Sequence, residues 1–370
     1  MVSGGRTPKT RFLCDIDSVL TEYNKSKIHI ATIGRHSALN IFKGAHDEGF
    51  PTVCICKKGE EKLYKAYGLA DEIIHVEEYE RIIDDDVQDR LRELNSIVIP
   101  HGSFNAYIEG DELETKFCVP MLGNRTLLQW ERSRDLQTKW LQNAGLTVPK
   151  IYEKPSDINQ LVLVKFPGAR GGKGYFIADS EESFNVKMDR RIKSGLATKE
   201  DAKRCQIQEY IIGVSVYPHY FYSPLKKQVE LLGVDKRYEA SVDGIGRIPA
   251  PEQLENKLTP SFTVVGNFPL VVRESLLPEI YEIGEKVVEA SHKIAKPGAI
   301  GPFCLETIVT ENLKVVAFEI SARIVAGCNA EIGQSPYAYL LYNEVMYMGK
   351  RIAREIKEGV KQNRLGEVVA

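Results

Sequence analysis

VLVKFPGARGGKGY, residues 162–175, joins an apolar strand that ends in a lysine to a glycine-rich loop with further basic side chains. Glycines let backbone N–H groups approach phosphate oxygens without a clash from a Cβ atom. Lys165, Arg170 and Lys173 add positive charge at the same place. The stretch therefore predicts a grip for a polyphosphate. The residues predicted to contact the phosphates are Lys165, Gly171, Gly172 and Lys173.

Two other phosphate-binding loops do not fit this spacing. A Walker A loop requires a glycine five positions before Gly172 and Ser or Thr after Lys173, where the chain has Pro167 and Gly174. A dinucleotide-binding fingerprint that starts at Gly172 fails at Ile177. A hairpin turn with solvated lysines remains the structural alternative.

The composition is that of a globular protein with two or three packed modules: 370 residues, 43% hydrophobic and 27% charged. A net charge of −2 argues against a nucleic-acid-binding surface, and no apolar run is long enough to span a membrane. The 7 scattered cysteines include no Cys-x-x-Cys pair, so they indicate neither a disulfide framework nor a zinc site. We expect a cytoplasmic protein that binds anionic small molecules, without nucleic-acid or membrane partners.

From residue 27 the chain alternates strands and helices, which predicts an open parallel sheet. The expected strands of this sheet are 28–34, 52–56, 72–76 and 96–100. Beyond residue 150 the strands become longer and hairpin-like, with helices at 275–294 and 336–361, which is typical of an α+β fold. The predicted fold class is therefore α/β and α+β. We expect one domain over residues 1–125 and a second over 126–370, with a lid subdomain at about 150–225.

Polar residues follow two strands of the predicted parallel sheet. His36 comes after the strand 28–34, and Ser103 comes after the strand 96–100. Ligands bind at the carboxyl ends of such strands, and a helix that starts at Ser37 offers N–H groups to a phosphate monoester. His36 and Ser103 are therefore candidate ligand contacts. The alternative is that they are only a neighbour of a helix cap and a turn residue.

Two acids, Glu306 and Glu319, lie within apolar strand patterns, where a carboxylate needs a cation or donor to offset its desolvation. If residues 311–312 form a two-residue turn, the two acids are diagonal neighbours on one face, about 7–8 Å apart. A three-residue loop would place them on opposite faces. The first arrangement predicts Mg²⁺ between the acids, and a solvated pair of acids is the alternative.

The segment Gln208-Glu209-Tyr210-Ile211 is extended and alternates polar with apolar side chains. Such a segment can present backbone groups to the edge of an adenine ring. Gln208, Glu209, Tyr210 and Ile211 are therefore predicted nucleotide contacts, although many strands share this pattern.

The order of these motifs resembles the ATP-grasp superfamily. More narrowly, the chain resembles the archaeal formate-dependent formaminoimidazole carboxamide ribotide synthetase family of purine biosynthesis, over residues 27–361. The motifs that carry the resemblance are TIGRHS (32–37), VIPHGSF (98–104), KFPGARGGKGYF (165–176), DKRYE (235–239), GPFCLE (301–306) and FEISAR (318–323). The resemblance implies an ATP-grasp fold preceded by an open parallel-sheet (preATP-grasp) domain.

The resemblance also implies a reaction. ATP would phosphorylate formate, and the amine of aminoimidazole carboxamide ribotide would attack the formyl phosphate, giving the formamide, ADP and phosphate. The chain would thus be an ADP-forming carbon–nitrogen ligase that uses ATP with Mg²⁺ or Mn²⁺. The implied roles are catalysis for Lys165, Lys173 and Arg323, ribotide binding for His36, Ser103 and Asn267, ATP binding for Asp235 and Arg237, and metal binding for Glu306 and Glu319.

The chain departs from the family pattern at a few positions. Arg35 stands where family members often carry serine, Val325 where some carry aspartate, and Ser321 where many ATP-grasp enzymes carry asparagine as a further metal ligand. Two alternatives therefore stay open: a ligase of another carboxylate and amine, and a non-catalytic nucleotide-binding protein. The sequence also leaves open whether the chain forms a homo-oligomer.

Overall fold

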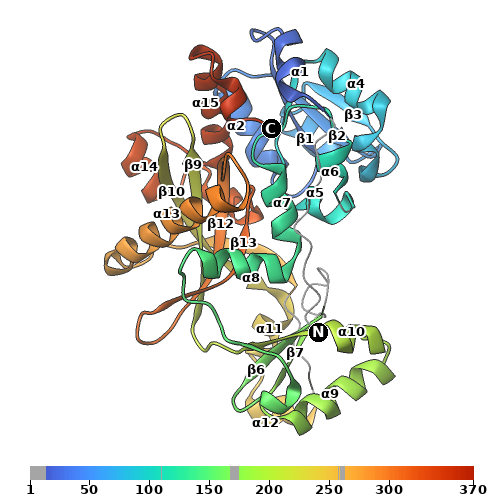
Figure 1. Cartoon of the computed structure of the whole chain (residues 1–370), viewed down its shortest axis with the longest axis vertical. Coiled ribbons are helices and arrows are strands. Elements are labelled where there is room, and N and C mark those ends of the chain that lie inside the picture. The colour runs from blue at the N-terminus through green and yellow to red at the C-terminus, as the bar shows by residue number, and fades with distance from the viewer. Residues whose placement is uncertain (1–13, 110, 167–174, 257, 259–262) are drawn as a thin grey trace.

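The computed structural model describes residues 14–109, 111–166, 175–256, 258 and 263–370. Its strands form three sheets, which follow one another along the long axis of the molecule (Figure 1). A parallel sheet lies at the top of that view, a five-stranded antiparallel sheet in the middle, and a small antiparallel sheet at the bottom. None of the helices in these described ranges is long and apolar enough to cross a membrane.

The first sheet is the open parallel sheet predicted from the alternating pattern. Its strand order is β3-β2-β1-β4, and every neighbouring pair is parallel. The central strands are buried along almost their whole length, as expected when helices cover both faces. The strands are β1 (His29–Ile33), β2 (Thr52–Cys56), β3 (Glu72–His75) and β4 (Ser96–Val98). The helices of this region are α1 (Ile16–Glu22), α2 (Ala38–Asp47), α3 (Lys62–Ala66), η1 (Tyr79–Ile83), α4 (Asp85–Glu93), α5 (Gly102–Tyr107) and α6 (Glu112–Thr115).

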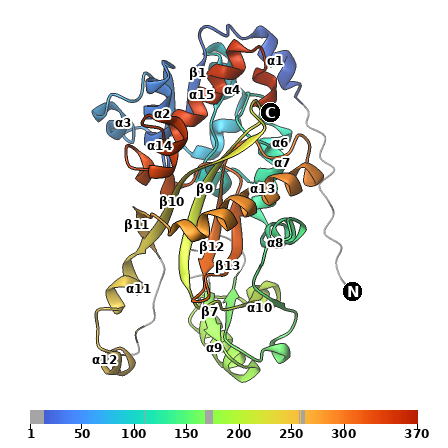
Figure 2. The same ribbon diagram turned by 90° about the vertical axis from the view of Figure 1, so that its left-hand side faces the viewer.

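The second sheet has the order β11-β10-β9-β12-β13, and its neighbours pair in antiparallel fashion. Helix α13 (Leu277–Ile294) lies across this sheet (Figure 2), and α8 (Arg134–Asn143) packs beside it. Trp140 of α8, Ile280 of α13 and Leu305 of the sheet share one buried apolar cluster. The strands are β9 (Val214–Ser223), β10 (Gln228–Glu239), β11 (Val264–Pro269), β12 (Gly301–Val309) and β13 (Val315–Ser321). The connecting helices are α7 (Arg125–Arg132), α11 (Ala240–Ile245), α12 (Ala250–Glu255), η4 (Glu274–Leu276) and η5 (Ala326–Glu331).

The third sheet, in the order β5-β8-β6-β7, is covered by α9 (Glu181–Lys193). The sequence pattern predicts strands at 161–166, 174–178 and 206–212, which correspond to β6, β7 and β8, but neither strand β5 nor this helix. Its apolar face is narrow, with only Phe184 and Met188 buried at a spacing of four residues among charged side chains. The remaining elements are β5 (Ile151–Tyr152), η2 (Pro155–Asp157), β6 (Val162–Lys165), β7 (Tyr175–Ala178), α10 (Lys199–Arg204) and β8 (Gln206–Glu209).

The single helix predicted over 336–361 is wrong. The structure has two helices there, α14 (Pro336–Tyr342) and α15 (Met348–Lys361), followed by η6 (Leu365–Glu367). Helix α14 ends because Asn343 adopts a left-handed backbone conformation, with φ of 51°. Asparagine tolerates that conformation at the end of a helix better than most residues do.

Helix α15 returns to the first sheet region and packs directly on α2 (Figure 1). Glycines face each other where the two helices cross: a Cβ atom on Gly44 would lie 2.0 Å from the carbonyl carbon of Gly349. The backbone N–H of Gly349 also donates to the side-chain oxygen of Asn40, at 2.6 Å. The C-terminal segment thus contributes to the packing of the N-terminal region, and the division at residues 1–125 and 126–370 stays a prediction.

We predict that Gly44→Ala destabilises the protein by about 3 kcal/mol, because the added methyl group forces the two helix backbones apart. The measurement is the free energy of unfolding in urea. Gly244→Ala is the matched control, since Gly244 lies in α11 with open space around it, and alanine there should be neutral or stabilising by at most ~1 kcal/mol. Equal stability of Gly44→Ala and wild type would contradict the close crossing.

Candidate active site

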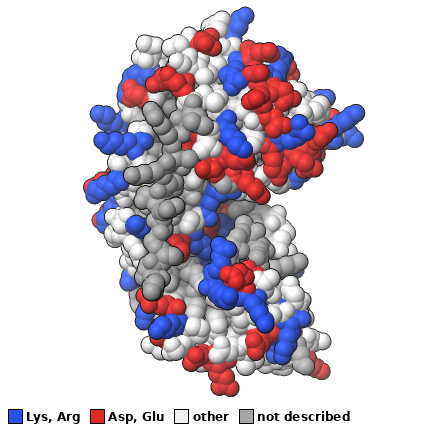
Figure 3. All heavy atoms as spheres, turned by 45° about the vertical axis from the view of Figure 1, so that its right-hand side comes forward, with Lys and Arg blue, Asp and Glu red and all other residues white. Residues whose placement is uncertain are grey.

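A cavity of about 430 Å³ opens where the parallel-sheet region meets the five-stranded sheet. Lys and Arg side chains gather near the hollow between the upper and lower parts of the molecule (Figure 3). The polar and charged residues of the cavity wall are His36, Tyr217, Asp235, Arg237, Asn267, Glu306, Ser321 and Arg323. The structure therefore brings predicted site residues from both halves of the chain into one cavity.

Glu306 and Glu319 lie directly opposite each other on β12 and β13. The predicted diagonal arrangement is wrong, because the loop between the strands has three residues, with Leu313 at φ of 62°. That loop alone would put the acids on opposite faces. A β-bulge corrects this: Thr307 pairs with Ala317 and Glu306 with Glu319, so that Phe318 is the extra residue. The acids therefore share a face, with Cβ atoms about 5 Å apart by ordinary sheet geometry.

Charged neighbours surround this pair of acids. Burial, and then the charge of Glu306, raise the pKa of Glu319, whereas Lys165, Arg134 and Arg237 act in the opposite direction. A guanidinium nitrogen of Arg237 donates to Glu306. Lys165 is almost fully buried at the end of β6, and burial lowers its pKa. The charge of Glu306 opposes the ionisation of Glu319, and a hard divalent cation between the two carboxylates would relieve that repulsion.

His36 follows β1 and enters the cavity wall with a left-handed backbone, at φ of 53°. Its ring stacks on that of His101, with ring centres 5.2 Å apart. Burial, followed by the charge of Arg323 and by His101, lowers the pKa of His36 to about 2, so its ring is neutral at ordinary pH. A neutral imidazole offers one donor and one acceptor to a ligand.

A buried network that the sequence analysis did not identify holds Asp235 in place. The ring of His219 bonds Asp235 through Nε2 at 2.7 Å and Glu331 through Nδ1. Burial by itself lowers the pKa of His219, but Cys328, Glu331 and Asp235 raise it well above its ordinary value. Asp235 also accepts from the amide of Asn267 at 2.6 Å. Asp235, which the resemblance assigns to ATP binding, thus orients Asn267, which the resemblance assigns to ribotide binding.

Arg323 lies in the cavity wall and is held by Glu131 of α7, a second residue that the sequence analysis missed. The guanidinium contacts one oxygen of Glu131 at 2.9 and 3.0 Å, and the other oxygen accepts from the backbone N–H of Ala322 at 2.8 Å. Glu131 lies on the buried side of α7 with Leu127, Leu128 and Trp130, and nothing in the sequence of this helix indicates which residue it pairs with. That Glu131 pairs with Arg323 becomes visible only in the structure, where α7 packs against β13.

Some predicted residues lie away from the cavity. Ser103 is buried and its backbone N–H donates to His101, but the described cavity wall does not include it. Gln208 lies on β8, beside β6, and lines a narrow crevice together with Phe318. Its side-chain oxygen has no partner among the described residues. Glu209 accepts from the backbone of Lys150 at 3.0 Å.

The rest of the nucleotide prediction is only partly covered by the structure. Tyr210 and Ile211 follow β8, Tyr210 being exposed and Ile211 half-buried. Gly171, Gly172 and Lys173 lie outside the described residues.

The positions that depart from the family pattern have different surroundings. Arg35 turns to Glu60, with a contact of 2.5 Å, and lies over the ring of Tyr79. Val325 and Ser321 line the cavity. Of these differences, those at 325 and 321 therefore bear directly on what the cavity accepts.

Comparisons with known proteins agree with this arrangement. Two family models match, one described as a domain of unknown function (DUF1297) over residues 183–370 and one as a protein of unknown function (DUF1246) over residues 30–152. Two relatives carry the name 5-formaminoimidazole-4-carboxamide-1-(beta)-D-ribofuranosyl 5'-monophosphate synthetase. The protein from Archaeoglobus fulgidus is 52% identical over 95% of this chain and 97% of its own, and that from Methanocaldococcus jannaschii is 50% identical over 96% and 99%.

Solved structures show the same fold. The IMP biosynthesis protein PurP from Thermococcus kodakaraensis is 32% identical, with a TM-score of 0.72 over 92% of this chain and 100% of that one. The ADP complex of purK, N5-carboxyaminoimidazole ribonucleotide synthetase, has a TM-score of 0.57 at 13% identity, over 87% and 79% of the two chains. The fold is thus of the ATP-grasp type, as the resemblance implied.

The raised pKa of Glu319 leads to a prediction about stability in the absence of divalent metal. A carboxyl group whose pKa is raised in the folded state disfavours folding increasingly as the pH rises above its ordinary value of 4.5. Glu319→Gln should therefore have a higher melting temperature than wild type at pH 8, and the gain should vanish well below pH 4.5. The exposed control Glu285→Gln on α13 should show no such gain. A Glu319→Gln protein that is less stable than wild type at pH 8 would contradict the inferred repulsion between Glu306 and Glu319.

Proposed function

We propose a reaction for this chain, which belongs to the family of 5-formaminoimidazole-4-carboxamide ribonucleotide synthetases of IMP biosynthesis. In this reaction formate is joined to the amine of aminoimidazole carboxamide ribotide, and ATP is converted to ADP and phosphate. The observation that carries the proposal is the pair of facing acids, Glu306 and Glu319, beside Lys165 and next to a cavity shared by both halves of the chain.

The donor set at this pair suits Mg²⁺, because both ligands are carboxylates and a cation would offset the desolvation and repulsion that raise the pKa of Glu319. When bound, the metal would neutralise charge on the phosphate oxygens of ATP. Glu306 and Glu319 would hold it. Mn²⁺, which also prefers oxygen ligands, would fit the same pair.

Basic side chains of this chain would stabilise the transferred phosphoryl group. Lys165 is desolvated at the end of β6, and a buried cation interacts strongly with an anion that enters its surroundings. Lys173, with Gly171 and Gly172, would add a grip on the phosphates, and Arg323 would stabilise charge from the cavity wall. The adenine would lie against Gln208, Glu209, Tyr210 and Ile211. Asp235 and Arg237 would contact ATP where the nucleotide lies next to the ribotide.

The ribotide would occupy the cavity, whose volume of about 430 Å³ lies in the usual range for small-molecule sites. The neutral ring of His36 and the amide of Asn267, which Asp235 orients, would contact it. Ser103, whose backbone N–H donates to His101, would contact the ribotide from the carboxyl end of β4. An amine that attacks an acyl phosphate mainly needs alignment and exclusion of water, so these residues would position the amine rather than remove a proton.

Two alternatives make different demands on the same site. A ligase of another carboxylate and amine would keep the acid pair but differ at the acceptor, where Val325 lines the cavity. A non-catalytic nucleotide-binding protein has little use for two mutually repelling acids, which cost stability unless a metal binds. The acid pair therefore favours a ligase.

We predict that the protein converts ATP, formate and aminoimidazole carboxamide ribotide into ADP, phosphate and the formylated ribotide, without a folate. Coupled ADP release and chromatography of the ribotide products measure this. Formate alone should support only slow ADP release, because formyl phosphate forms productively only when the amine is in place. Turnover with acetate as fast as with formate would support the other ligase, and no acid-dependent ADP release would support the non-catalytic protein.

A second prediction separates the two substrate sites. His36→Ala should raise the KM for the ribotide about tenfold while leaving ATP affinity unchanged, because it removes one buried hydrogen-bonding group from the cavity. Lys165→Ala should lower kcat/KM for ATP about 100-fold or more and spare ribotide affinity. Steady-state kinetics with each substrate varied, together with calorimetric binding, measure both effects.

Two exposed residues provide controls for this comparison. Lys154→Ala, in the loop before η2, and Lys187→Ala, on α9, should leave both kinetic parameters close to those of wild type. If His36→Ala and Lys165→Ala, both folded, impaired the two affinities equally, the assignment of separate sites would be wrong.

A further inference from the structure

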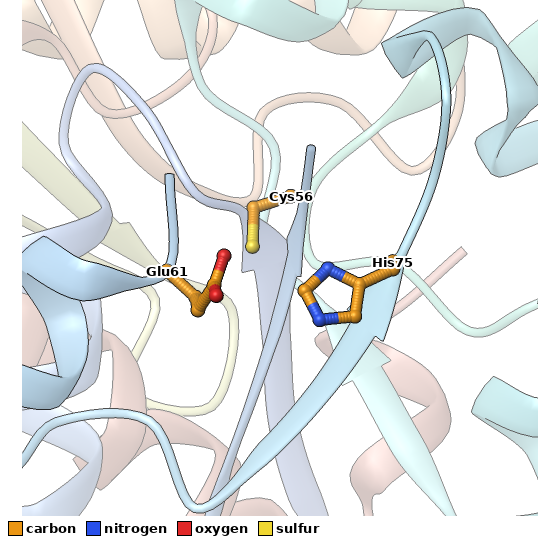
Figure 4. Close-up of side chains that lie close together, drawn as sticks. All are labelled: Cys56, Glu61 and His75. Carbon is orange, nitrogen blue, oxygen red and sulfur yellow. The ribbon is translucent and has the colours of Figure 1, made fainter. Parts of the chain in front are cut away.

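A second group of metal-binding side chains lies at the carboxyl edge of the parallel sheet, apart from the acid pair. Cys56 ends β2, His75 ends β3, and Glu61 immediately precedes α3. The two strands are parallel neighbours, and Cys56 pairs with His75 in their register. The sulfur, a carboxylate oxygen of Glu61 and a ring nitrogen of His75 all lie within 4.8 Å of one another, and the side chains converge (Figure 4).

These three side chains keep ligand atoms available. Neither ring nitrogen of His75 makes a hydrogen bond to any residue in the described part of the chain. The backbone N–H of Gly59 donates to Glu61 Oε2 at 2.6 Å, which orients the carboxylate.

The other Cys/His/Glu group of the described structure differs in this respect. His219, Cys328 and Glu331 are also close together, but they are fully buried. Both ring nitrogens of His219 are already engaged, with Asp235 and Glu331. That group therefore has both ring nitrogens of its histidine occupied by internal hydrogen bonds, whereas those of His75 are not bonded to any other described residue.

We propose that Cys56, Glu61 and His75 bind one divalent transition-metal ion of the zinc class, with water as the fourth ligand. A thiolate, an imidazole and a carboxylate are the ligands that Zn²⁺ takes in proteins, at about 2.0–2.3 Å in tetrahedral geometry. In such a site the ligand atoms are about 3.5 Å apart, so the group must contract by about 1 Å. Half-buried Glu61 and exposed His75 can supply that movement by side-chain rotation, while buried Cys56 stays in place.

Binding would release the proton of the Cys56 thiol and would fix the turn that leads into α3. Glu60, next to Glu61, accepts from the guanidinium of Arg35 and from the hydroxyl of Tyr79. Arg35 in turn precedes His36 of the cavity wall. The bound ion would thus have a structural role, holding the turn 57–61 and through it the backbone at the entrance of the cavity. Mg²⁺, a hard ion, would not compete well for a thiolate site.

The test uses the full chain, freed of metal with a chelator and studied without nucleotide. Co²⁺ added to it should give a sulfur-to-metal charge-transfer absorption that saturates at one equivalent and is displaced by Zn²⁺. Zn²⁺ should also raise the melting temperature. His75→Ala should weaken Zn²⁺ binding about tenfold or more, and Cys56→Ser should abolish the charge-transfer band.

Two variants serve as controls. His46→Ala removes another partly exposed histidine of the same sheet region, and Cys328→Ser removes the thiol of the other group; both should keep the band and the stoichiometry. The proposal is overturned if wild type shows no saturable Co²⁺ band, or if His75→Ala, which does not disturb the core, binds Zn²⁺ as tightly as wild type. A band lost in Cys328→Ser and retained in Cys56→Ser would assign the metal to the buried group instead.

Discussion

The mutual repulsion of Glu306 and Glu319 is the constraint around which the active site is arranged. Buried Glu306 and half-buried Glu319 lie directly opposite each other on neighbouring strands, and desolvation, followed by the charge of Glu306, raises the pKa of Glu319. Lys165 and Arg237 reach this pair from different sheets and offset part of the repulsion. The part of the repulsion that these basic residues do not offset would be relieved by a divalent cation. This makes the pair a candidate metal site rather than an ordinary ion-pair network.

A second consequence concerns the cavity next to the acids. Its wall combines His36 from the parallel sheet with Asp235 and Asn267 from the antiparallel sheet, so it exists only while the two regions stay docked. The tight crossing of α2 and α15 contributes to that docking, because helix α15 follows the antiparallel sheet in the chain yet packs on the N-terminal region. The ring of His219, bonded to both Asp235 and Glu331, orients the Asp235 carboxylate of the wall. Substrate recognition therefore depends on contacts that link distant parts of the chain.

Several features could be predicted from the sequence because their signals are local. The alternation of strands and helices indicated the parallel sheet, and the apolar run that ends at Lys165 indicated strand β6. Apolar flanks marked Glu306 and Glu319 as buried acids. The register between those acids could not be predicted, since it depends on a left-handed Leu313 and on a bulge at Phe318, two small backbone changes that offset each other. Helix α9 was missed because its few apolar residues are scattered among charged side chains, and only Phe184 and Met188 are buried.

The sequence by itself determined the class of fold, the order of the motifs and the chemical types of side chain available for binding a nucleotide, because these depend on periodicity and spacing along the chain. Tertiary structure alone decided which side chains meet. Glu131 holds Arg323 across a helix–strand contact, His219 bonds a glutamate more than a hundred residues away, and Cys56 lies beside His75 through parallel pairing. Each of these partners has an unremarkable local pattern. Their proximity follows from how the sheets and helices pack, since electrostatic and hydrogen-bonding interactions depend on distance in space and not on separation along the chain.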